Sequence, residues 1–148
     1  MPKAIKVKST DASTLEDRNS TADESLPMQF DALNAAITQA ETRLRSLKPI
    51  KSVWHNYDTD CSPEGVPEVE HFIGFCKLDE KWRIAYSPDD GSGPNHPIYP
   101  LTDCKIETRV CAARHIPKLH ELIVASKEEF IIEVDNVISV LRSFAQKS

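Results

Sequence analysis

The chain has 148 residues, 40% of them hydrophobic and 28% charged, and a formal net charge of −5 at pH 7. This length suits one domain with one core, and the composition excludes a wholly disordered chain. The acidic balance argues against nucleic-acid binding, which relies on cations that neutralise phosphates. No apolar run approaches the roughly 18 residues of a membrane span, and the N-terminus lacks the apolar segment of a secretory signal. We therefore expect a cytoplasmic protein without a membrane segment.

The first 25 residues are predicted to be a flexible polar tail, and residues 26–148 a single domain. Residues 9–25 hold sixteen polar or alanine residues and one leucine, so ordering them would bury little apolar surface. An alternative is that residues 4–8 add an edge strand to a sheet, with Ile5 and Val7 on one face.

A helix is predicted over residues 26–48. Ser25 and Pro27 are start signals, and Pro49 ends the helix. The heptad-like spacing lasts only about two and a half heptads, which favours packing inside the chain's own domain over a coiled coil. The apolar positions alternate between spacings of three and four residues: Phe30, Leu33, Ile37, Ala40, Leu44 and Leu47.

Residues 49–100 are predicted to form a small antiparallel sheet of two to four strands. Seven of the ten prolines and all four glycines lie there, among short β-rich runs. A central hairpin is expected over residues 71–87 with a four-residue loop at 78–81, a third strand at 52–57, and loops at 58–67 and 88–100. The expected cross-strand neighbours are Ile73 with Tyr86, Phe75 with Ile84, and Lys77 with Trp82.

Residues 103–145 are predicted to be helical, with a break or kink at Pro117 because proline removes a backbone donor. A helix over residues 118–145 spans about 42 Å, which is long for a small domain. Together these elements predict an α+β fold: an N-terminal helix, a small antiparallel sheet, and C-terminal helices packed on the sheet and on the first helix.

The candidate metal ligands are Cys111 and His115, because residues four apart share one helix face and both side chains bind zinc. Two ligands do not complete a site, so Cys61, His55 or His71 must join them. The alternative is that the cysteines are small buried hydrophobes beside a solvent-facing histidine.

Asp58 and Asp60 form a D-x-D pair, which can hold a divalent cation, although acidic residues near proline and glycine are also ordinary turn chemistry. No nucleophile has a recognisable catalytic signature around it; Cys61 with His55 or His71 is the conceivable Cys/His pair. We expect free thiols and no cofactor. Five aromatic side chains are predicted either to form a binding face or to fill the core: Trp54, Tyr57, Trp82, Tyr86 and Tyr99.

Two classes of function remain open. The first is a non-enzymatic protein-interaction or assembly module that binds a protein partner or self-associates, because the last helix carries a broad apolar stripe. The second is a small metal-dependent hydrolase or other enzyme with residues from segments 55–76 and 104–115, namely Asp58, Asp60, His71, Cys111 and His115. The predicted interaction residues are Phe130, Val134, Val137, Leu141 and Phe144, flanked by Ile131 and Ile138. The stripe predicts a homodimer or a larger assembly, and the alternative is a monomer in which the sheet and the short helix before Pro117 cover the rest of the stripe.

Overall fold

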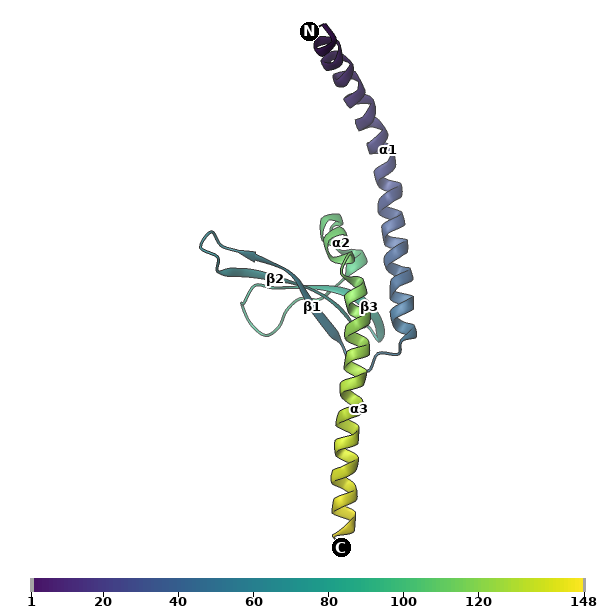
Figure 1. Ribbon diagram of the computed structural model, residues 1–148, viewed down its shortest axis with the longest axis vertical. Coiled ribbons are helices and arrows are strands. Elements are labelled where there is room, and N and C mark those ends of the chain that lie inside the picture. Colours follow the sequence, from purple (N-terminus) through teal and green to yellow (C-terminus); the bar gives the residue numbers. More distant parts are fainter. Residues whose placement is uncertain (1, 148) are drawn as a thin grey trace. The chain divides into compact units, whose positions relative to one another are not determined.

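The computed structural model describes residues 2–147, with side chains from residue 14 onward. The predicted α+β fold is confirmed: an N-terminal helix is followed by a four-stranded antiparallel sheet in the order β1-β2-β3-β4 and then by C-terminal helices (Figure 1). In chain order the elements are α1 (Pro2–Ser46), β1 (Val53–Cys61), β2 (Pro67–Leu78), β3 (Lys81–Asp89), β4 (Tyr99–Pro100), the 3-10 helix η1 (Leu101–Asp103), α2 (Ile106–Ala113) and α3 (Ile116–Gln146).

The chain divides inside α1 into two compact units, Met1–Ala36 and Ile37–Ser148. In the first unit, the side chains of residues 14–29 are all exposed. The predicted start of the helix near residue 26 is wrong, since α1 begins at Pro2 and includes Pro27. The alternative edge strand at residues 4–8 is also wrong, because these residues are helical. The flexibility of residues 1–25 stays a prediction.

In the second unit, the last turns of α1 bury Ile37 and Leu44, both members of the predicted apolar stripe. The helix ends at Ser46, and Lys48 adopts a left-handed backbone with φ 54° just before Pro49. The helix therefore ends just before Pro49, as the sequence predicts, because proline disfavours helical geometry in the residue before it.

The register predicted for the hairpin of β2 and β3 is confirmed in all three pairs: Ile73 with Tyr86, Phe75 with Ile84, and Lys77 with Trp82. The predicted four-residue loop is wrong, because Leu78 pairs with Lys81 and only two residues make the turn. Asp79 and Glu80 have φ of 51° and 67°. Two consecutive positive φ values are the geometry of a type I′ turn, whose twist matches that of the strands.

The loops predicted at 58–67 and 88–100 are shorter than expected. β1 continues to Cys61 through an irregularity between Asn56 and Asp58, and β2 begins at Pro67. Pairing with β2 places Asp58 opposite His71, so cross-strand contacts outweigh the polar composition that indicated a turn. On the C-terminal side, β3 runs to Asp89, and Tyr99–Pro100 form the short strand β4.

The core lies between the helices and the sheet. α3 contacts β1 and β2, and its residues Leu119 and Ile123 are fully buried. The break predicted at Pro117 is confirmed, because α2 ends at Ala113 and Pro117 lies in the first turn of α3, where its missing N–H costs nothing. The largest fully buried side chains from the sheet and η1 are Ile73, Phe75, Ile84 and Leu101.

Candidate functional site

Five rings from the sheet and from the residue before α3 form a continuous row, which we call the aromatic row. His55 and Tyr57 come from β1, His71 from β2, Tyr86 from β3, and His115 precedes α3. Successive ring centroids lie 5.9 Å apart for His55–His115, 5.2 Å for His115–Tyr57, 6.2 Å for Tyr57–His71 and 5.9 Å for His71–Tyr86. The irregularity of β1 between Asn56 and Asp58 leaves Tyr57 without a strand partner. The Tyr57 ring lies beside His71 on one side and His115 on the other.

Hydrogen bonds fix His71 at both ring nitrogens. Its Nε2 lies 2.8 Å from Oδ2 of Asp60, and its Nδ1 lies 2.7 Å from the hydroxyl of Tyr86. Since a carboxylate only accepts, Nε2 donates to Asp60, and in the neutral imidazole Nδ1 accepts the Tyr86 proton. Asp60 is 59% exposed and His71 only 20%, so this chain of bonds runs from solvent into the protein.

Burial perturbs the titration of the two tyrosines of the row. It raises the pKa of Tyr57 well above its ordinary value, with further contributions from Tyr86 and Cys111. Burial also raises the pKa of Tyr86, helped by Cys104 and Asp60. Both phenols are therefore neutral near pH 7 and can donate hydrogen bonds.

At the other end of the row, the pKa of His55 is lowered, first by burial and then by the charges of His115 and Lys118. The neutral imidazole is therefore the favoured form of His55 in the folded protein.

A pocket of about 190 Å³ opens beside the row, between the sheet and α2. Its walls combine aromatic rings with two carboxylates, one hydroxyl and one thiol. The lining residues are Tyr57, Asp58, His71, Tyr86, Glu107, Thr108 and Cys111.

The structure brings most of the predicted site residues to this place. Asp58 and Cys111 line the pocket, His115 belongs to the row, and Asp60 bonds to His71. Cys61 does not line this pocket; it is the exposed last residue of β1, opposite Pro67. Within residues 2–147, no group of three or more His, Cys, Asp or Glu side chains has an arrangement that could hold a metal ion.

Sequence reasoning singled out Tyr57 and Tyr86 only as general aromatic candidates, and it missed Glu107 and Thr108. These two residues occupy adjacent positions in α2 and face the pocket only because α2 lies over this end of the sheet. No sequence pattern marks that placement. Of the other aromatic candidates, Trp82 stacks on Phe75 at 5.6 Å between centroids, and Tyr99 is exposed.

Trp54 lies on the sheet beside Gly74, its partner in β2. A Cβ at Gly74 would lie 2.2 Å from the Trp54 ring, so only glycine permits this approach. The Trp54 ring and Phe72 line a second pocket of about 370 Å³, with Asp89, His96 and Ile98 among its other walls.

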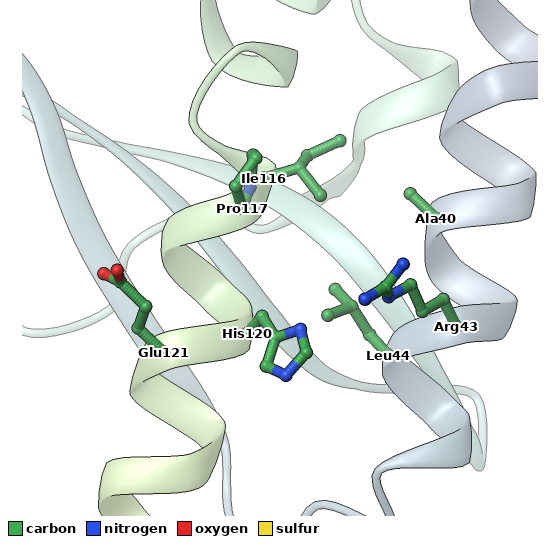
Figure 2. A pocket seen from close by; sticks show the side chains of 7 residues that line it. All are labelled: Ala40, Arg43, Leu44, Ile116, Pro117, His120 and Glu121. Carbon is green, nitrogen blue, oxygen red and sulfur yellow. The ribbon is translucent and has the colours of Figure 1, made fainter.

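A third pocket, of about 470 Å³, lies between the end of α1 and the start of α3 (Figure 2). Ala40, Leu44 and Ile116 give it an apolar lining, and Figure 2 also shows the side chains of its polar residues Arg43, His120 and Glu121. All of the lining residues belong to the second unit: Ala40, Arg43, Leu44, Ile116, Pro117, His120 and Glu121.

The predicted interaction residues lie on the part of α3 that extends beyond the sheet (Figure 1). Every residue from 128 to 147 is exposed, whereas Leu119, Ile123 and Ser126 upstream are buried. The five predicted residues, which we call the α3 stripe, are 39–75% exposed: Phe130, Val134, Val137, Leu141 and Phe144. Four more large apolar side chains on the same segment are also exposed: Ile131, Ile132, Ile138 and Val140.

No family model, curated protein or solved structure matches this chain. Among the helices of residues 2–147, none has both the length and the apolar character that crossing a bilayer requires.

Proposed function

We propose that this protein is a non-enzymatic assembly module that associates through the C-terminal half of α3. The observation that carries the proposal is the α3 stripe with its flanks: together with Ile131, Ile138 and Val140, eight large apolar side chains are exposed on one side of a segment in which every residue is exposed. Single exposed apolar residues are normal on protein surfaces, but a contiguous set of this size typically marks an interaction site.

The helix itself needs a partner over this length. Residues 128–147 span about 30 Å. A helix in a protein gains most of its stability from packing an apolar face against a neighbour. Upstream, α3 obtains that packing from β1 and β2. From residue 128 onward every described residue is exposed, and the least exposed large apolar side chain, Ile138, still has 37% of its surface accessible. Association supplies the missing contact and removes the stripe from water.

The arrangement of the apolar residues on the helix supports a broad contact. At about 100° per residue, the α3 stripe occupies a sector of about 80°, and Ile131, Ile138 and Val140 widen it to about half of the circumference. Ser139 lies opposite the centre of this sector. One face of the segment is therefore suited to another helix, whereas the opposite face carries a single large apolar side chain, Ile132.

Sedimentation equilibrium of the full chain at micromolar concentration tests the proposal. We expect a mass that is a multiple of 16.6 kDa. Val137→Glu or Leu141→Glu should give a folded monomer, because a buried, unpaired carboxylate is costly in an apolar interface. Ser139→Glu adds the same charge to the opposite face of the same helix and should leave the assembly intact. A 16.6 kDa species with an unchanged mass in all three variants contradicts the proposal.

A second candidate function is a small enzyme that uses the aromatic row. Its support is the hydrogen-bonded chain Asp60–His71–Tyr86 beside a pocket that also contains Cys111. An oriented imidazole is the usual general base of hydrolases. Hydrolysis of model esters and phosphoesters by the purified protein tests this candidate. Activity lost in His71→Ala and retained in His96→Ala, a histidine outside the row, favours it, whereas no turnover of either class of substrate counts against it.

A further inference from the structure

We infer that the partner of the α3 stripe is the α3 helix of a second copy of this chain, lying antiparallel around a two-fold axis near residue 135. The inference rests on the proposed function, because it specifies the occupant of the same surface. Three observations carry it: the side of α3 that faces the sheet, the length of the exposed segment, and the distribution of its charges.

The stripe and the sheet contact lie on the same side of α3. At about 100° per residue, the buried positions Leu119, Ile123 and Ser126 fall in the same 80° sector as Phe130 and Phe144. One face of the helix is therefore covered by β1 and β2 in its first half and exposed in its second half.

This shared side determines the direction of the partner. In a parallel pair, both sheets would have to lie between the two helices at the level of Ile123. Each copy's own sheet already occupies that space on its α3, so the two sheets would collide. In an antiparallel pair, the two sheets lie at opposite ends of the dimer. The second copy's helix then covers the apolar face of the first copy's α3 from the point where the first copy's sheet ends.

The length of the exposed segment fits this arrangement. Antiparallel layers pair Phe130 with Leu141 and Val134 with Val137 of the second copy, so that the whole stripe is used. Phe144 then lies level with Lys127, whose ammonium group donates to the carbonyl of Leu47 at the boundary of the covered half. The helix of each copy therefore ends where the other copy's sheet begins, and the contact closes as a two-fold dimer.

The charges of the segment are unevenly distributed along its length and favour the same orientation. Its first half is acidic, with Glu128, Glu129, Glu133 and Asp135, whereas its end carries Arg142 and Lys147. Antiparallel pairing brings the acidic half of each copy level with the basic end of the other, whereas parallel pairing brings each charge level with its own copy, which like-charge repulsion disfavours. These side chains all lie outside the 80° sector of the stripe, so the preference acts at long range and weakens with salt.

Cross-linking of three exposed positions on one flank of the helix, with a flexible bismaleimide of about 16 Å reach, tests the orientation, because packed helices lie about 8–10 Å apart. The full chain carries Glu129→Cys, Asn136→Cys or Ser143→Cys one at a time, and linked peptides are identified by mass spectrometry so that native thiols are distinguished. Residues 129 and 143 are about 21 Å apart along one helix. All three positions are polar and exposed, so these variants preserve the stripe and the fold.

We expect Asn136→Cys to link to itself, and a mixture of Glu129→Cys with Ser143→Cys to give a 129–143 link. Neither of these two variants should link to itself when alone. Self-links at 129 and 143 without the mixed link overturn the antiparallel arrangement while leaving the assembly, and the proposed function, intact. An associated protein without a 129–143 link also overturns it. A 16.6 kDa monomer in sedimentation is the separate outcome that removes the proposed function itself.

Discussion

The carboxylate of Glu41, near the end of α1, accepts a hydrogen bond from the backbone N–H of Ile84 in β3 at 2.9 Å. Residue 84 of β3 pairs with Phe75 of β2 on one side, but β4 pairs only with Ala85 and Tyr86, so the other side of β3 lacks a strand neighbour at residue 84. Arg45, one turn further along α1, donates from its Nε to the carbonyl of Trp82 at 2.9 Å. The helix thereby satisfies a donor and an acceptor on a strand edge, which otherwise invites pairing with other chains.

Glu41→Ala should destabilise the protein by about 2–4 kcal/mol. The side chain is 2% exposed and also accepts from Nε of Arg83 at 3.1 Å, so its loss leaves a buried N–H and a guanidinium without their acceptor. Urea unfolding measures the change. Glu24→Ala, at an exposed position of the same helix, is the control and should change the free energy of unfolding by less than about 0.5 kcal/mol.

Phe75→Ala and Ile84→Ala should each cost roughly 2–5 kcal/mol, because both side chains are fully buried and face each other across the hairpin. Denaturant unfolding is again the measurement, and Val66→Ala, in the exposed connection before β2, is the control. Losses below about half a kcal/mol at both core positions would be incompatible with the packing described above.

Glu80→Gly should stabilise the protein by about 0.5–1 kcal/mol. Glu80 has φ 67°, a left-handed conformation that glycine adopts without steric cost, and the change creates the Asp-Gly pair that type I′ turns prefer. The melting temperature reports the gain. Glu80→Val, with a β-branched side chain at the same φ, should instead lower the melting temperature, and equal effects of the two substitutions would contradict the argument.

A chain that begins at Thr21 should retain a cooperative thermal transition with an unchanged midpoint. The reason is compositional: residues 9–25 contain one leucine, and residues 14–29 are exposed throughout. Differential scanning calorimetry compares the two lengths. A loss of several degrees would mean that the N-terminal residues are docked in the folded protein.

Lowering the pH should weaken the fold through His55. Its folded-state pKa is below the ordinary value of 6.5, owing mainly to burial and then to His115 and Lys118. The unfolded chain therefore binds the proton more tightly, so this contribution is complete above about pH 6.5 and is lost as the pH falls through the folded pKa. Melting temperatures between pH 8 and pH 5 measure the effect. His55→Gln should show a smaller loss across that window, whereas an identical slope in both proteins would exclude His55 as the cause.

The sequence by itself determined the elements whose signals are local and periodic. The 3.6-residue spacing located α3, Pro117 located its start, and the alternation of the hairpin set the register of Phe75 opposite Ile84. The register is predictable because a slip of one residue would turn every core side chain of the hairpin toward the other face. The apolar α3 stripe was visible for the same reason.

Only the tertiary structure decided what depends on neighbours distant in the sequence. Pairing with His71 made Asp58 a strand residue, although its local sequence resembles a turn. Likewise, nothing in the spacing of Asp60, His71 and Tyr86 indicates that one imidazole joins the other two side chains, because that contact exists only when three strands lie in register. The sequence located an apolar face on α3, but the fold decided which half of that face is covered. α3 packs on β1 and β2 and buries Leu119 and Ile123, whereas Phe130 is exposed.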